Sequence, residues 1–158
     1  MSKYSVLAAR LKKDLAQVDK AVQAAVSQAK KATATGDADY LQAAALSLQN
    51  FYMGVERVFE EIAKQVDESL PTGASSHREL LDQMGLELPS RPIVLQANTL
   101  EELNEYRGFR HVALHRYGFE LQPRRIQELV VALPACQTHL SEDVESFCTF
   151  LLDLDRGL

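Results

Sequence analysis

The residues best suited to chemistry lie between Tyr106 and Arg125. Two of the four histidines of the chain, His111 and His115, occur there, together with five arginines and a single acidic residue. This segment therefore carries a net charge of +4 in a chain whose net charge is −5. Its arginines are Arg107, Arg110, Arg116, Arg124 and Arg125. A positive segment in an otherwise acidic chain suits one anionic ligand held at one place.

Arginine and histidine together are suited to cleaving RNA without a metal ion. A planar guanidinium can donate to two phosphate oxygens at once. An imidazole, whose ordinary pKa is about 6.5, can move protons near neutral pH. Histidine would deprotonate a 2′-hydroxyl or protonate the leaving oxygen, while arginine would hold the phosphate as charge builds up. On composition alone, a solvated arginine face with structural histidines is the alternative.

The spacing of Arg110 and His115 bears on how they could act together. They are five residues apart, which is about 140° around an ideal helix, so they do not share a stripe. One copy of the chain would assemble the pair poorly, whereas two copies around a two-fold axis could bring the two residues together. A distortion of the helix near Gly118 would be another way to realign His115.

Hydrophobic spacing predicts the elements that position these residues. Apolar residues recur at steps of three and four over 5–33, which indicates an amphipathic helix. The same steps continue without a slip over 41–66 and predict a second helix with a heptad-like seam. Because only a short break around Gly36 separates them, these helices should pack as an antiparallel hairpin. A short helix is predicted over 76–84.

Two more long helices are predicted in the second half of the chain. Thr99 begins a capping-box pattern, so one helix is expected over about 100–117, with Gly118 as its stop. The last helix is expected over 123–154, and Pro134 inside it predicts a kink. No window alternates with a period of two for long enough to indicate a sheet. We therefore predict an all-α, antiparallel helical bundle of four main helices and one short helix, in a single domain over 1–158.

The remaining composition predicts a protein of the cytoplasm. The two cysteines, Cys136 and Cys148, lie twelve residues apart on one predicted helix, roughly 18 Å, which is too far for a disulfide. We expect two buried thiols in a reducing compartment. The first residues do not read as a signal peptide, and no apolar run is long enough for a membrane span.

Several other histidines and acidic residues are candidates for a site. His111 and His115 could share a helix face, but Arg107 and Phe119 occupy the positions where a third metal ligand would be needed, so no metal and no cofactor are expected. Glu56 and Glu60 could pair with Arg107 or Arg110 across the bundle, although a solvated face is favoured. The other two histidines, His77 and His139, are expected at isolated exposed or capping positions.

The motif Arg110-x4-His115-x-Tyr117 resembles the R-x4-6-H motif of HEPN ribonucleases, and more narrowly the R-x4-H-x-Y form of HepT toxins. HEPN proteins usually carry a polar residue directly after the arginine, and here it is His111. The long helical hairpin, the Arg91-Pro92 connection and the terminal helix are also similar, so the resemblance covers nearly the whole chain and implies a HEPN-like bundle.

The resemblance implies a metal-independent endoribonuclease toxin of a type VII-like toxin–antitoxin pair, which cleaves tRNA or mRNA. Arg110 and His115 would be catalytic, and His111 would support them. A homodimer would bring the catalytic residues together across its interface. A cognate nucleotidyltransferase antitoxin would transfer AMP to Tyr117 and so block the site. The remaining arginines of the positive segment are the candidate RNA contacts: Arg107, Arg116, Arg124 and Arg125.

Two other functions are consistent with the same sequence. The bundle could be a non-catalytic binding module or accessory subunit, possibly the antitoxin, that docks a nucleotidyltransferase. It could also be a dimeric scaffold with an incidental basic patch, in which case substitutions at Arg110, His115 and Tyr117 would behave as ordinary surface changes.

Overall fold

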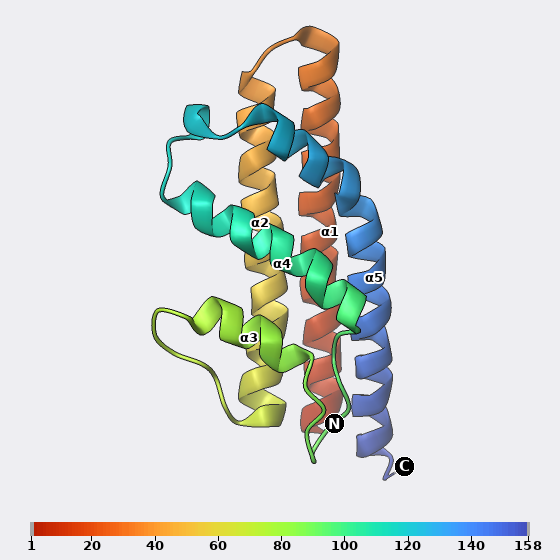
Figure 1. The fold of residues 1–158 in the computed structure, drawn as a ribbon. Coiled ribbons are helices and arrows are strands. Elements are labelled where there is room, and N and C mark those ends of the chain that lie inside the picture. Colours follow the sequence, from red (N-terminus) through yellow and green to blue (C-terminus); the bar gives the residue numbers. More distant parts are fainter. Residues whose placement is uncertain (1, 158) are drawn as a thin grey trace.

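A computed structural model describes residues 2–157, which form a bundle of five α-helices (Figure 1). The four long helices are α1 (Lys3–Thr35), α2 (Asp39–Ile62), α4 (Ala97–Leu114) and α5 (Pro123–Asp155), and α3 (Ser76–Met84) is short. A π-helical turn, Ala63–Asp67, continues α2, and a 3-10 turn, Gly118–Glu120, precedes α5. Within residues 2–157 the β-type pairing is limited to one isolated bridge between Leu88 and Arg91. The predicted all-α bundle is confirmed.

Helices α1 and α2 form the predicted antiparallel hairpin, which runs the length of the molecule (Figure 1). Gly36 ends α1 in the left-handed conformation, with φ of 72°, and its N–H donates to the carbonyl of Ala32. The Oδ1 atom of Asp37 then accepts from the N–H of Asp39, the first residue of α2, at 2.9 Å. Further along, a Cβ on Gly54 would lie 2.8 Å from Cγ2 of Val18, so the two helices approach closely there.

A buried ion pair fixes the connection that leads from α2 through α3 to α4. Asp67, at the end of the π-helical turn, accepts from Nε and Nη2 of Arg91 at 2.6 and 2.8 Å. The two side chains are 1% and 0% exposed. Arg91 also donates to the carbonyl groups of Leu86, Pro92 and Gln83. Because this side chain is both paired and hydrogen-bonded throughout, its charge can be buried, and the connection is held beside the end of α2.

Helix α4 begins and ends about three residues earlier than predicted. At its start, the N–H of Gln96 donates to Oδ2 of Asp143 in α5 at 3.0 Å. The expected cap, Thr99, lies inside the helix with its hydroxyl buried and unpaired. At its end, the N–H of His115 donates to the carbonyl of Val112, three residues back, which tightens and closes the last turn. His115 and Tyr117 therefore lie in the connection after the helix, and the predicted stop at Gly118 is wrong.

Helix α5 starts at Pro123, as predicted, and contains Pro134. Figure 1 shows that its first turns run obliquely and that the remainder runs beside α1, a change of direction consistent with the expected kink. The Oγ atom of Ser5 donates to Oδ2 of Asp155, which joins the beginning of α1 to the end of α5.

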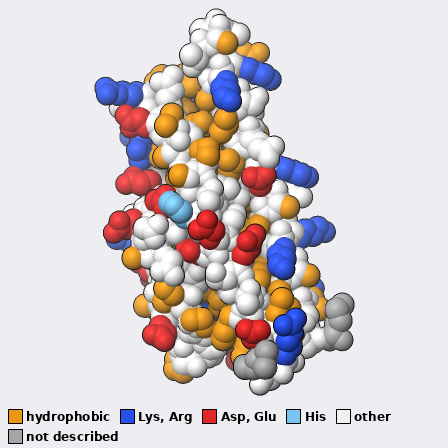
Figure 2. Space-filling view, turned by 90° about the vertical axis from the view of Figure 1, so that its right-hand side faces the viewer, with side chains coloured by type: hydrophobic (Ala, Val, Ile, Leu, Met, Phe, Trp, Pro, Cys, Tyr) orange, Lys and Arg blue, Asp and Glu red, His pale blue; other side chains and the backbone are white. Residues whose placement is uncertain are grey.

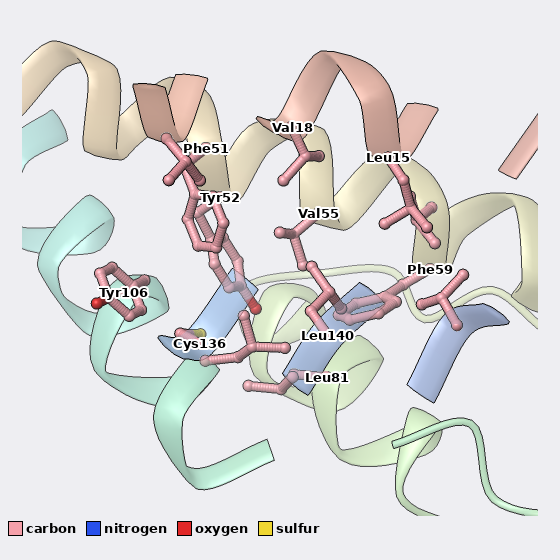
Figure 3. Close-up of a cluster of buried hydrophobic side chains, with 14 of the residues drawn as sticks. Leu15, Val18, Phe51, Tyr52, Val55, Phe59, Leu81, Tyr106, Cys136 and Leu140 are labelled. Carbon is pink, nitrogen blue, oxygen red and sulfur yellow. The ribbon is translucent and has the colours of Figure 1, made fainter. Parts of the chain in front are cut away.

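Aromatic side chains from α2 and α4 fill the centre of the bundle (Figure 3). The rings of Phe51 and Tyr106 pack edge to face with centroids 5.3 Å apart, and the Tyr106 hydroxyl donates to the carbonyl of Leu129. Cys136 and Cys148 are buried free thiols, as predicted. Burial is the main cause that raises the pKa of the Cys136 thiol to about 12.

The outer face formed largely by α5 carries acidic and basic side chains side by side (Figure 2). Hydrophobic side chains gather over the upper part of that face, where α1 and α5 line an apolar groove of about 710 Å³ that includes the exposed Val131. None of the helices within residues 2–157 is long and apolar enough to cross a membrane.

Candidate functional site

Three of the four histidines of the chain meet in one open groove of about 470 Å³ between α3 and the end of α4. The groove is lined by Ala74, Ser75, His77, Arg78, Arg107, Arg110, His111, Leu114 and His115. Three arginines and three histidines thus face the same space, and no acidic side chain is among its lining residues. This charge distribution suits an anionic ligand.

One face of α4 supplies most of the groove. Arg107, Arg110, His111 and Leu114 recur at steps of three and one, so they project from the same side of the helix. His115 reaches the groove because α4 has already ended at Leu114. Its ring packs edge to face against His111, with centroids 5.0 Å apart. A single copy of the chain therefore brings Arg110 and His115 to one groove, contrary to the expectation from an ideal helix.

Glu56 of α2 binds two of the side chains that line the groove, Arg110 and His77. Its side chain is only 6% exposed. Oε1 accepts from Nη1 of Arg110 at 2.8 Å, and Oε2 accepts from Nδ1 of His77 at 2.7 Å. The favoured prediction of a solvated face is wrong for Glu56, and the alternative, in which it pairs with Arg110 across the bundle, is confirmed. Three helices are thereby linked through one carboxylate.

The sequence held a signal for the burial of Glu56. It lies four residues after Tyr52 and three before Phe59, and both of these aromatic residues are fully buried. A buried stripe that is wider than the strict heptad seam includes this position. A carboxylate there needs cationic partners, because an unpaired buried charge is strongly destabilising. Burial raises the pKa of the Tyr52 phenol, and the negative charge of Glu56 raises it further. The Tyr52 hydroxyl therefore stays neutral.

His77 and its neighbour Arg78 line the groove, although neither was predicted from the sequence to belong to the site. His77 was expected at an isolated position, but α3 places it against Glu56 in the same groove as Arg110. No local sequence pattern predicts the contact between His77 and Glu56, because α3 is positioned by the distant Arg91–Asp67 pair. His139 also has a carboxylate partner, Glu102, at 2.6 Å, but it is not among the residues that line the groove.

Tyr117 lies two residues beyond His115, outside the lining of the groove. Its side chain points outward, and the residue is 71% exposed. Its ring stacks on that of Phe119, with centroids 5.4 Å apart and planes within 6°. Its backbone N–H donates to Oε1 of Glu120 at 3.0 Å, which holds the turn. The phenol is therefore open to another molecule.

The four candidate RNA contacts fall on different faces. Only Arg107 lines the groove, where its Nε donates to Oδ1 of Asn104. Arg116 and Arg125 line a second pocket, of about 340 Å³, on the opposite side of α4. Arg125 is paired there with Glu105 at 2.7 Å. Arg124 lies 3.4 Å from Glu128 and lines neither pocket.

The side chains of the groove are suited to binding a phosphate and to exchanging protons with the groups attached to that phosphate. Guanidinium groups supply fixed donors for anionic oxygens, and imidazoles supply groups that gain or lose a proton near neutrality. Within residues 2–157, no three or more histidine, cysteine, aspartate or glutamate side chains gather as metal ligands would.

Comparison with known proteins gives one match. A family model described as HepT-like protein matches residues 43–151. This span includes Glu56, His77, Arg110, His115 and Tyr117. Searches of curated proteins and of solved structures found no match.

Proposed function

The chain belongs to the HepT-like family of HEPN-type proteins, and on this premise we propose that it is a metal-independent endoribonuclease. It would act as the toxin of a type VII-like toxin–antitoxin pair. The observation that supports this most is the groove in which Arg110, held by the buried Glu56, lies with His111 and His115. Arg110 and His115 are also the first two residues of the R-x4-H-x-Y motif that resembles that of HepT toxins, and the third, Tyr117, lies just outside the groove.

Arg110 would bind the phosphate at the cleaved bond. Its Nη1 atom is engaged by Glu56, so the other guanidinium N–H groups are the ones left for phosphate oxygens. An arginine held at one end presents its remaining donors without first having to be ordered, and such fixed donors stabilise the charge that develops in the transition state. Arg107, which lines the same groove, would contact a neighbouring phosphate.

The reaction needs only proton transfer and charge stabilisation. The 2′-hydroxyl oxygen of the RNA attacks the adjacent phosphorus and loses its proton to a base. The bond between phosphorus and the 5′ oxygen breaks, and an acid gives that oxygen a proton. The products are a 2′,3′-cyclic phosphate and a 5′-hydroxyl. His115 would be the base or the acid, and His111, whose ring packs against it, would support its position.

Substrate and assembly follow from the family resemblance. The RNA would be tRNA or mRNA, and Arg116, Arg124 and Arg125 would contact it beyond the groove. The chain would act as a homodimer in which two grooves face each other across a two-fold axis. Leu114, which is exposed at the mouth of the groove, would then be covered.

Tyr117 would be the point of control. A cognate nucleotidyltransferase would let the phenol oxygen attack the α-phosphorus of ATP, with pyrophosphate leaving and the phenolic proton lost. The exposure of Tyr117 allows such an enzyme to reach it. The AMP group would place negative charge and bulk two residues from His115 and would compete with RNA for the arginines.

The experiment is cleavage of total tRNA and mRNA by purified protein in EDTA, with the protein produced in the absence of any nucleotidyltransferase. Wild type should cut, and His115→Ala and Arg110→Ala should not. His139→Ala is the matched control, because His139 forms its own carboxylate pair away from the groove. Cleavage that is equal in wild type and His115→Ala would contradict the proposal.

A non-catalytic binding module is the second candidate, and the exposed, stacked Tyr117 and Phe119 favour it. Such a pair presents apolar surface to a partner such as a nucleotidyltransferase. In that case Phe119→Ala would abolish formation of the complex, while His115→Ala would leave cellular toxicity unchanged. Loss of toxicity in His115→Ala would exclude the binding module.

A further inference from the structure

We propose that His77 is a second catalytic histidine of the ribonuclease site, the general base that takes the proton of the 2′-hydroxyl. His115 would then be the acid that protonates the 5′ oxygen. This inference rests on the proposed function and assigns to α3 a part of the reaction that the R-x4-H-x-Y motif does not contain.

The geometry of His77 is that of a carboxylate-held base. A carboxylate can only accept, so Nδ1–H of His77 donates to Oε2 of Glu56 at 2.7 Å. This bond fixes the tautomer and leaves Nε2 as the ring nitrogen that can exchange a proton. Glu56 is 6% exposed, whereas the His77 side chain is 58% exposed and lines the groove. A buried carboxylate behind an accessible imidazole stabilises the imidazolium that forms when the ring accepts a proton.

Glu56 also fixes His77 relative to Arg110. The two side chains bind the two oxygens of the same carboxylate. A phosphate held by the free donors of Arg110 would therefore lie beside the His77 ring, and the attacking 2′-hydroxyl is one of the groups next to that phosphate. Shared anchoring of this kind sets the base and the phosphate-binding arginine in one arrangement before the substrate arrives.

The reaction needs one group that takes up a proton and another that gives one. The groove has a histidine for each task, and the two histidines come from different elements. His77 lies on α3, and His115 lies at the end of α4. His111 is less suited to be the second group, because its ring packs on His115 and it lies near the same end of α4.

The groups around His77 act on its charge in opposite directions. From α2, the Glu56 carboxylate favours the protonated ring. On α3 itself Arg78, and from α4 Arg107 and Arg110, favour the neutral ring, and His111 and His115 do so when they are charged. The His77 ring is therefore surrounded by one buried anion and several cations.

The test compares His77→Asn and His77→Ala with wild type, with His139→Asn as the matched control. Asparagine retains an N–H donor for Glu56 but cannot take up a proton, so His77→Asn separates positioning from proton transfer. Single-turnover cleavage is measured from pH 5 to 9. Affinity is measured separately with a 2′-O-methyl RNA, which cannot be cut, and folding is checked by thermal unfolding.

We expect His77→Asn to bind the uncut RNA within about threefold of wild type but to cleave at least about 10²-fold more slowly, the usual loss for a general base. The rise of rate with pH on the acidic side should disappear, because a base must be unprotonated to act. His139→Asn should behave as wild type. Wild-type rates and an unchanged pH profile in His77→Asn, with His115→Ala inactive, would overturn the role of His77 and leave the ribonuclease standing. An inactive wild type would overturn both.

Discussion

Replacing Arg110 by alanine should reduce both stability and activity, whereas His115→Ala should reduce activity alone. The structural reason is Glu56, whose buried carboxylate would keep only His77 as a partner after Arg110 is lost. Removing one partner of a fully buried ion pair costs roughly 3–5 kcal/mol. A hydrogen bond to a charged group is worth roughly 1.5–3 kcal/mol. Because Arg110 is one-fifth exposed and His77 remains bonded, we expect the lower end, about 2 kcal/mol.

The assay is urea or thermal unfolding of the single variants Arg110→Ala and Glu56→Gln and of the double variant. For a chain of this length, about 2 kcal/mol corresponds to a fall in Tm of about 4–8 °C. The two substitutions should be non-additive by more than about 1 kcal/mol, since they remove the same contact. His115→Ala, at an exposed position, should stay within about 0.5 kcal/mol of wild type. Additive effects of Arg110→Ala and Glu56→Gln would refute the coupling through the buried carboxylate.

Three further predictions concern the packing, the thiols and the control of the site. Gly54→Ala should destabilise by about 1–3 kcal/mol, since its Cβ would clash with α1, whereas Gly108→Ala, whose Cβ meets nothing within 4 Å, should be neutral or stabilising in urea unfolding. The thiols of Cys136 and Cys148, whose pKa values burial raises, should not react with a disulfide reagent at pH 8 until urea unfolds the chain; rapid reaction of the native protein would contradict their burial. Tyr117→Phe should still cleave RNA but should escape inactivation by the cognate nucleotidyltransferase and ATP, and inactivation of this variant would place the acceptor elsewhere.

Hydrophobic periodicity predicted the bundle well because each helix buries a stripe that repeats every three or four residues. The boundaries of α4 were predicted less well, since its start depends on a contact from Asp143, almost fifty residues away in sequence. A local capping pattern at Thr99 was the stronger signal in the sequence, but tertiary packing buried that residue inside the helix. The early end of α4 matters most for the candidate site, because it brings His115 into the groove.

The candidate site was predictable in part. The motif and the local charge pointed to Arg110, His111 and His115, and all three line the groove. The pairing of Glu56 with Arg110 is one of the two alternatives that the sequence offers, although the solvated face was favoured. The contact of His77 with Glu56 was not predicted, because the placement of α3 depends on contacts distant in sequence. The position of Glu56 between the buried Tyr52 and Phe59 favours the paired arrangement over the solvated one.

Cleavage of RNA in this groove by proton transfer, with no metal, is tested most directly by the chemistry of the new RNA ends. In EDTA, wild type and His139→Ala should generate fragments that carry 2′,3′-cyclic phosphate and 5′-hydroxyl ends, detected by mass spectrometry, and His115→Ala should generate none. Activity that requires added Mg²⁺ and leaves 3′-hydroxyl and 5′-phosphate ends, or identical fragments from His115→Ala, would contradict the account.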